Sequence, residues 1–158
     1  MPGASQTPRG AKTPELAARR AAMALAGLAT ADELRAALAG LGPVDAEDLR
    51  PPESGLVMTR GRIGGDGRAF NLGEASVTRA AVRLPSGETG FAYHLGRDRA
   101  RARHAAILDA LWQRADDRAA VEAALAPVAA RRARESAAEA RRIAATRVNF
   151  FTLARGED

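Results

Sequence analysis

The spacing of hydrophobic positions changes along the chain. Between residues 13 and 50 apolar side chains recur at helical spacing, and between 55 and 96 they alternate with polar ones, as in half-buried strands. Helical spacing returns from 98 to 145. The pattern predicts an α+β fold with a single domain over residues 13–158. In this fold an antiparallel β-meander of about four strands packs on N-terminal and C-terminal helices.

Capping residues indicate where the N-terminal helices begin. A helical pair is predicted over residues 13–50, with helices at 14–28 and 31–39. Thr30 followed three residues later by Glu33 is a capping box, which favours a helix start at this point. Asp45 to Leu49 is assigned one further helical turn. Residues 1–12 are rich in Pro, Gly and Ser and are predicted to be disordered.

The C-terminal third is predicted to contain two more helices. Asp98 can cap a helix that runs to about Arg114. A last helix is predicted to start at Asp116 and Asp117 and to reach Ala145, with an interruption near Pro127.

Four runs of alternating residues make up the predicted meander. The Gly64–Gly67 segment is a strong hairpin signal because glycines tolerate positive φ, and Pro85-Ser86-Gly87 is a second turn. The four predicted strands are Leu56–Ile63, Ala69–Leu72, Ser76–Leu84 and Glu88–Leu95.

The alternation also assigns the two faces of the sheet. Apolar residues are expected to face the helices, namely Val57, Ile63, Ala80, Val82, Leu84, Phe91, Tyr93 and Leu95. The opposite face is predicted to carry four arginines with some apolar residues, namely Arg60, Arg62, Arg79 and Arg83 with Leu56 and Met58. One face of the sheet is therefore predicted to be basic.

Two interpretations of this basic face stay open. Guanidinium groups bind phosphate or phosphonate oxygens bidentately, so the face could hold a polyanion. In that case Asn71, Glu74 and Thr78 could orient a hydroxyl or a water. Alternatively, the arginines pair with carboxylates of another subunit. Reversing the charge of Arg79 would then break a complex.

Composition restricts the chemistry. The net charge is +5 and Lys12 is the only lysine, although arginine in place of lysine is also typical of GC-rich genomes. The absence of cysteine excludes a thiolate zinc site and an iron–sulfur cluster held by this chain. The two histidines lack a partnering carboxylate pattern, so no metal site is predicted. No secretory signal or membrane-spanning run is recognised, which favours a cytoplasmic protein.

No catalytic residue is predicted. The run RIGGDG lacks the lysine and Ser/Thr of a phosphate-binding Walker loop and stands between predicted strands. No serine stands in a nucleophile-elbow pattern. The segment 146–158 is β-prone, so it either pairs with this chain's own sheet or adds a strand to the sheet edge of a partner. In both cases it is expected to pack within the complex, through residues that include Arg147, Phe150 and Phe151.

Several phrases of the chain resemble the PhnG subunit of bacterial carbon–phosphorus lyase. They are RGRIGGDG, FNLGEASVTR, GETGFAYHLGRD and TRVNFFTLARGED. They follow the family's order and are near its spacing, and they cover roughly the last two-thirds of the chain. The N-terminal helices are similar in length and character but share no specific phrase.

The resemblance implies a role in phosphonate utilisation. PhnG-like proteins act with PhnI, PhnH and PhnL to transfer the ribose triphosphate of MgATP to an alkylphosphonate with release of adenine. PhnJ then cleaves the carbon–phosphorus bond, and PhnG, PhnH, PhnI and PhnJ form a two-fold assembly. The resemblance implies no cofactor bound by this chain and no catalytic residue in it, with MgATP a substrate of the complex. Arg60, Arg62 and Arg79 would then brace the PhnI-like subunit or contact the triphosphate.

Two other classes of protein remain open. A small nucleic-acid-binding protein could use the same arginines on phosphates, but the predicted sheet has no platform of exposed aromatic side chains for stacking bases. A self-sufficient nucleotide hydrolase would require a local motif that the chain does not show.

Overall fold

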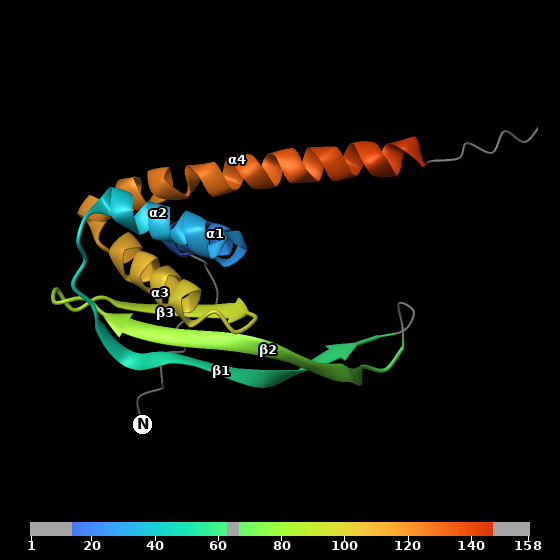
Figure 1. The fold of residues 1–158 in the computed structure, drawn as a ribbon, viewed down its shortest axis with the longest axis horizontal. Coiled ribbons are helices and arrows are strands. Elements are labelled where there is room, and N and C mark those ends of the chain that lie inside the picture. The colour runs from blue at the N-terminus through green and yellow to red at the C-terminus, as the bar shows by residue number, and fades with distance from the viewer. Residues whose placement is uncertain (1–13, 63–66, 147–158) are drawn as a thin grey trace, which may run out of the picture.

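The computed structural model describes residues 14–62 and 67–146. One face of a three-stranded sheet is covered by helix α3, and the other three helices pack on the far side of α3 (Figure 1). The helices are α1 (Pro14–Leu28), α2 (Ala31–Leu41), α3 (Arg99–Gln113) and α4 (Ala115–Ala145). The α+β class is confirmed. Residues 1–12 and 147–158 lie outside the described residues, so their predicted structure stays a prediction.

Helix α3 forms the centre of the core. Every residue from Ala105 to Trp112 is buried, because the helix lies between the sheet and the other helices. Asp98 accepts a hydrogen bond from the backbone N–H of Arg101 at 2.9 Å, which confirms the predicted cap. None of the helices within residues 14–62 and 67–146 is long and apolar enough to cross a bilayer.

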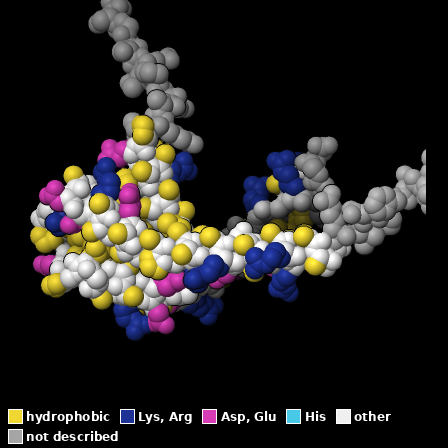
Figure 2. Space-filling view, turned by 90° about the horizontal axis from the view of Figure 1, so that it is seen from above, with side chains coloured by type: hydrophobic (Ala, Val, Ile, Leu, Met, Phe, Trp, Pro, Cys, Tyr) yellow, Lys and Arg dark blue, Asp and Glu magenta, His cyan; other side chains and the backbone are white. Residues whose placement is uncertain are grey.

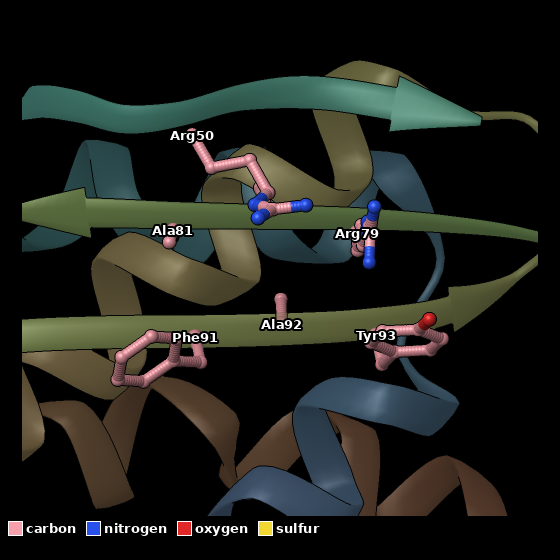
Figure 3. A pocket seen from close by; sticks show the side chains of 7 residues that line it. Arg50, Arg79, Ala81, Phe91, Ala92 and Tyr93 are labelled. Carbon is pink, nitrogen blue, oxygen red and sulfur yellow. The ribbon is translucent and has the colours of Figure 1, made fainter. Parts of the chain in front are cut away.

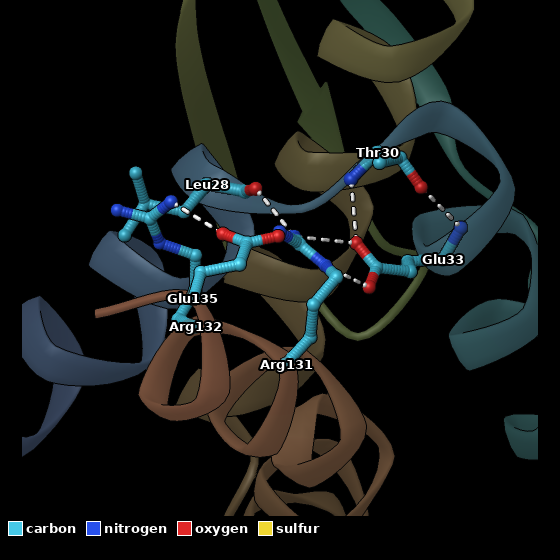
Figure 4. Close-up of polar contacts among 6 residues, drawn as sticks. All are labelled: Leu28, Thr30, Glu33, Arg131, Arg132 and Glu135. Carbon is cyan, nitrogen blue, oxygen red and sulfur yellow. Dashed lines mark hydrogen bonds and ion pairs between the residues drawn. The ribbon is translucent and has the colours of Figure 1, made fainter. Parts of the chain in front are cut away.

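The capping box at the start of α2 is confirmed. The Glu33 N–H donates to Thr30 Oγ1 at 3.2 Å, and the Thr30 N–H donates to Glu33 Oε2 at 2.8 Å. Arg131 of α4 donates to both oxygens of the same carboxylate, at 2.7 and 2.9 Å, and to the Leu28 carbonyl at 3.0 Å (Figure 4). These bonds lower the pKa of Glu33 to about 2. They fix α4 to the junction between α1 and α2.

Strand β1 (Glu47–Gly61) begins earlier than predicted. The helical turn predicted at residues 45–49 is wrong, and the strand passes through Pro51 and Pro52. Because β1 is an edge strand, the missing proline N–H groups need not break a ladder on both sides. The pairing with the next strand shifts register between Arg50 and Glu53, which accommodates the two prolines.

The sheet has the order β1-β2-β3 with antiparallel pairing, so the meander is confirmed. The described residues form three strands, however, and not four. The predicted strands Ala69–Leu72 and Ser76–Leu84 belong to one strand, β2 (Phe70–Arg83). A bulge lies where Gly73 adopts a φ of 150°, a conformation that favours glycine, and the strand continues through it. The predicted turn at 64–67 lies mostly outside the described residues.

The side chains of strand β3 (Thr89–Leu95) point to the opposite faces of the sheet from those predicted. Phe91, Tyr93 and Leu95 are 61%, 60% and 74% exposed, so they do not face the helices. The residues of β3 that face α3 are small or polar, namely Gly90, Ala92 and His94. On β2 the assignment of Ala80 and Val82 to the buried face is confirmed, and Leu84, which follows the strand, is buried as predicted. Position 90 has no room for a side chain because α3 passes too close to Gly90.

Helix α4 continues through Pro127, so the predicted interruption is wrong. Proline in a helix interior removes one backbone hydrogen bond. The buried side chains of Val121, Leu125 and Val128 hold both sides of this position against the body, which keeps the helix continuous.

The hairpin of β1 and β2 extends beyond the rest of the sheet. Strand β3 pairs with residues 77–83 of β2, so residues 70–76 of β2 pair only with β1. We call residues 55–62 and 67–76 the ribbon. It projects from the body on the same side as the C-terminal half of α4 (Figure 1).

Candidate functional site

The sheet face that α3 does not cover carries exposed aromatic side chains next to a charged cluster. Cross-strand pairing places Phe91 beside Ala81 and Tyr93 beside Arg79 on this open face. Glu53 of β1 pairs with Arg79 on the same face. Large apolar side chains that remain exposed on a small domain indicate an interaction surface.

Two arginines of this face share one carboxylate. Glu53 Oε1 accepts a hydrogen bond from Arg79 Nε at 2.6 Å and from Arg50 Nη1 at 2.7 Å. Both bonds lower the pKa of Glu53, and the bond from Arg79 has the larger effect. Glu53 in turn raises the pKa of Arg79. The cluster therefore keeps one net positive charge. The side chains are about half exposed, so the pairing orients them more than it stabilises the fold.

A shallow pocket of about 300 Å³ lies between the arginines and the aromatic rings. Figure 3 shows the rings of Phe91 and Tyr93 along β3, with Ala92 between them and the two guanidinium groups over β2. On the open face the small side chain of Ala81 lies beside Phe91, which leaves room for a side chain of a partner. Aromatic residues and arginine at the centre of a patch are also the residues that contribute most to protein–protein binding.

Comparison with known proteins identifies the family. Residues 17–156 match the family described as "Phosphonate metabolism protein PhnG". The chain belongs to the PhnG family. A curated relative from Rhizobium meliloti (strain 1021) is 53% identical over 144 residues, which cover 90% of this chain and 92% of the relative. That relative is named the "Alpha-D-ribose 1-methylphosphonate 5-triphosphate synthase subunit PhnG". The resemblance found in the sequence is thereby confirmed.

The structure of this PhnG-family chain does not bring the predicted site residues together on one face. Arg60 lies on the ribbon, on the side of β1 that carries Met58, whereas Glu53 and Arg79 lie on the other side. Arg62 follows the end of β1. Arg79 and Arg83 share the open face, but Arg60 lies on the opposite side of the sheet. The prediction that all four arginines occupy a single basic face is therefore wrong.

The remaining predicted residues divide into three groups. Asn71 and Glu74 are exposed on the ribbon. Thr78 is fully buried, where its hydroxyl lies 2.8 Å from Ser54 Oγ and donates to the Gly96 carbonyl at 2.8 Å. It therefore braces β2 and is not accessible to a ligand. Arg147, Phe150 and Phe151 lie outside the described residues.

Of the open-face cluster, only Arg79 was predicted from the sequence. Arg50 and Glu53 lie between the helical turn predicted at residues 45–49 and the first predicted strand, where no element was expected. Phe91 and Tyr93 were expected to point inward because they are the apolar members of the alternation. The available signal was Gly90 and Ala92, since small residues at alternate positions fit a strand against which a helix packs closely.

Of the two histidines, His104 is part of α3, and His94 lies on β3 and faces that helix. His94 is 4% exposed and faces α3; burial, together with the positive charge of Arg101, lowers its pKa to about 4. Burial also lowers the pKa of His104. No group of three or more metal-ligating side chains occurs within the part of the chain that the structure describes. Because the pKa of each histidine is lowered, both imidazoles are neutral at physiological pH.

Proposed function

We propose that this chain is a subunit of an α-D-ribose 1-methylphosphonate 5-triphosphate synthase, as its relative is named. The complex would transfer the ribose triphosphate of MgATP to an alkylphosphonate and release adenine. The partners would be PhnI-, PhnH-, PhnJ- and PhnL-like proteins. The 53% identity over nearly the whole of both chains supports this assignment.

The role of the chain in that complex is assembly. The observation that carries this conclusion is the row of exposed side chains along β3, where Phe91, Tyr93 and Leu95 are all more than half exposed. Burying three such side chains against a partner contributes about 1.5–3 kcal/mol each relative to leaving them in water. The Arg50–Glu53–Arg79 cluster borders them and supplies directional contacts. MgATP and alkylphosphonate are bound by the complex as a whole.

The direct test is reconstitution. The chain is co-expressed with PhnI-, PhnH-, PhnJ- and PhnL-like proteins from the same genome, purified through a tag on this chain, and assayed for adenine release from MgATP and methylphosphonate. We expect co-purification and phosphonate-dependent adenine release that is lost when this chain is omitted. A chain that elutes alone and is dispensable for the reaction would refute the proposed function.

The location of the interface is tested separately. Replacing Phe91 and Tyr93 together by Ser should reduce co-purification by at least tenfold and leave the fold intact, because both side chains are exposed. Leu16→Ser is the matched control, since Leu16 is 44% exposed on α1, away from the sheet face. Equal yields for the two variants would place the interface elsewhere.

A further inference from the structure

Two parts of the chain project from the body without covering one another. One is the ribbon, and the other is the distal helix, which we define as residues 132–145 of α4. In the distal helix every residue except Ala138 is exposed. In the ribbon no described residue is fully buried. Both leave the body on the same side (Figure 1).

These projections carry most of the chain's excess charge. The described residues of the ribbon contain three arginines against one glutamate, and the distal helix contains four arginines against two glutamates. Together they hold four of the five net positive charges of the whole chain. Figure 2 shows Lys and Arg side chains gathered on both projections. The body is therefore close to neutral, and the two projections are basic.

The arginines of the body and those of the projections also differ in their surroundings. Several arginines on helices of the body pair with carboxylates from distant parts of the chain, as in Arg19–Asp109, Arg103–Asp48 and Arg118–Glu15. Among the ion pairs of the described residues, none includes the ribbon arginines. On the distal helix only Arg132 and Arg142 are paired, each with a glutamate of the same helix. Arg134 and Arg141 have no ion pair among the described residues.

Apolar side chains are interspersed among these charges. On the ribbon Leu56, Met58, Phe70 and Leu72 are 58%, 54%, 39% and 63% exposed, and on the distal helix Ile143 is 62% exposed. The free energy of exposed aliphatic side chains falls when they leave water and contact other apolar side chains. A surface that combines free guanidinium groups with exposed aliphatic residues is complementary to a protein surface that is acidic and partly apolar.

We propose that the ribbon and the distal helix clasp a single partner protein through an acidic, partly apolar surface of that partner. The inference rests on the proposed function, because the partner is taken to be a subunit of the synthase. The clasp is distinct from the open face around Tyr93. Association of the projections with those of a second copy is disfavoured because both carry positive charge. Nucleic acid is disfavoured because base stacking requires exposed aromatic side chains, and Phe70 is the least exposed of the four apolar side chains named on the ribbon.

The experiment is a competition during assembly. Wild-type chain with one tag and variant chain with another are purified separately and mixed in equal amounts with purified PhnI-, PhnH-, PhnJ- and PhnL-like proteins. The ratio of the two chains in the assembled complex is then measured. Three double variants are compared: Arg60→Glu with Arg62→Glu on the ribbon, Arg134→Glu with Arg141→Glu on the distal helix, and Arg20→Glu with Arg99→Glu as control. The control residues are exposed on α1 and α3 and have no ion pair among the described residues.

We expect each projection variant to be under-represented at least tenfold relative to the control variant when the complex is assembled in 0.05 M salt. The discrimination should shrink in 0.5 M salt, because the screening length falls from above 10 Å to a few ångströms. Thermal melts of the isolated variants should match that of the control, since the substituted side chains pack on nothing in the body.

The possible results separate the inference from the proposed function. Wild-type chain that assembles with no synthase subunit overturns both. Assembly of wild type together with equal incorporation of all three variants overturns the clasp and leaves the proposed function standing. A third result would assign the projections to nucleic acid and also overturn the clasp. In that case the projection variants are fully incorporated, and wild type binds a random DNA duplex in a salt-dependent way that these variants lose.

Discussion

Replacing Gly90 by Ala should destabilise the chain substantially. A Cβ atom at this position would lie 2.6 Å from the Ala110 nitrogen and 2.9 Å from the Ala110 Cβ, and nearer still to the Ala106 carbonyl oxygen. Ordinary contacts between such atoms are about 3.5–4.0 Å. Strand β3 and helix α3 must therefore separate by more than about 1 Å, and no flexible side chain can move out of the way instead.

The magnitude follows from the rigidity of both neighbours. Overpacking a core costs about 1–3 kcal/mol, and a clash with backbone atoms falls at the upper end of that range. For a chain of this size each kcal/mol lowers Tm by about 2–4 °C, so a fall of about 6–12 °C is expected. Urea denaturation and thermal melts of the full chain measure both quantities.

A matched control and a companion variant make the test decisive. Gly55→Ala also lies in a strand, but its Cβ would meet nothing within 4 Å, so its free energy of unfolding should stay within about 0.5 kcal/mol of wild type. Phe91→Ala should cost less than about 1 kcal/mol because Phe91 is 61% exposed, whereas an inward-facing phenylalanine would cost about 3–5 kcal/mol. A harmless Gly90→Ala combined with a damaging Phe91→Ala would show that β3 has the opposite orientation.

Two further predictions concern buried polar groups. His94 has a folded pKa of about 4, below the 6.5 of an exposed histidine, so the stability it contributes is present above pH 6.5 and is lost as the pH falls from 6.5 to 4. Urea denaturation across that range should show a loss of up to about 3 kcal/mol, which His94→Gln abolishes. Asp109→Asn should cost about 2–3 kcal/mol, because buried Asp109 accepts bonds from Arg19 at 2.7 and 2.8 Å and from the Phe91 N–H at 2.9 Å. Asp116→Asn, an exposed change on α4, is its control; equal stability of the two variants would contradict the role of Asp109.

Local signals in the sequence were sufficient for much of the fold. The capping box of Thr30 and Glu33 marks the start of α2 because its hydrogen bonds connect residues only three positions apart. The Asp98 cap and the meander order were also predictable, since caps and hairpins depend on neighbouring residues. The family could be recognised because long phrases of the chain are shared with it.

Features that depend on distant contacts were not predictable from the pattern. The orientation of β3 is decided by the close approach of Ala106 and Ala110 to Gly90, which no alternation of residues within β3 reveals. The path of β1 through Pro51 and Pro52 depends on its position at the sheet edge. The separation of Arg60 from Arg79 follows from the register of β1 and β2, and a shift of one residue reverses which face a side chain occupies.

The open face binds either a partner protein or a polyanion, and Glu53 distinguishes these two interpretations. Removing the charge of Glu53 should weaken binding in the first case and strengthen it in the second. Glu53→Gln leaves the guanidinium groups of Arg50 and Arg79 without their shared carboxylate. If the face binds a partner protein through Phe91 and Tyr93, the variant should be incorporated into the complex less well than wild type, because two unpaired charges must then lose water at the interface. If the face binds a polyanion, the variant should instead bind ATP more tightly than wild type, since one opposing charge has been removed. Asp116→Asn, an exposed change on α4 away from this face, controls for the loss of one negative charge. The exposed aromatic side chains beside the cluster favour the first result, and tighter ATP binding with unchanged incorporation would reverse that conclusion.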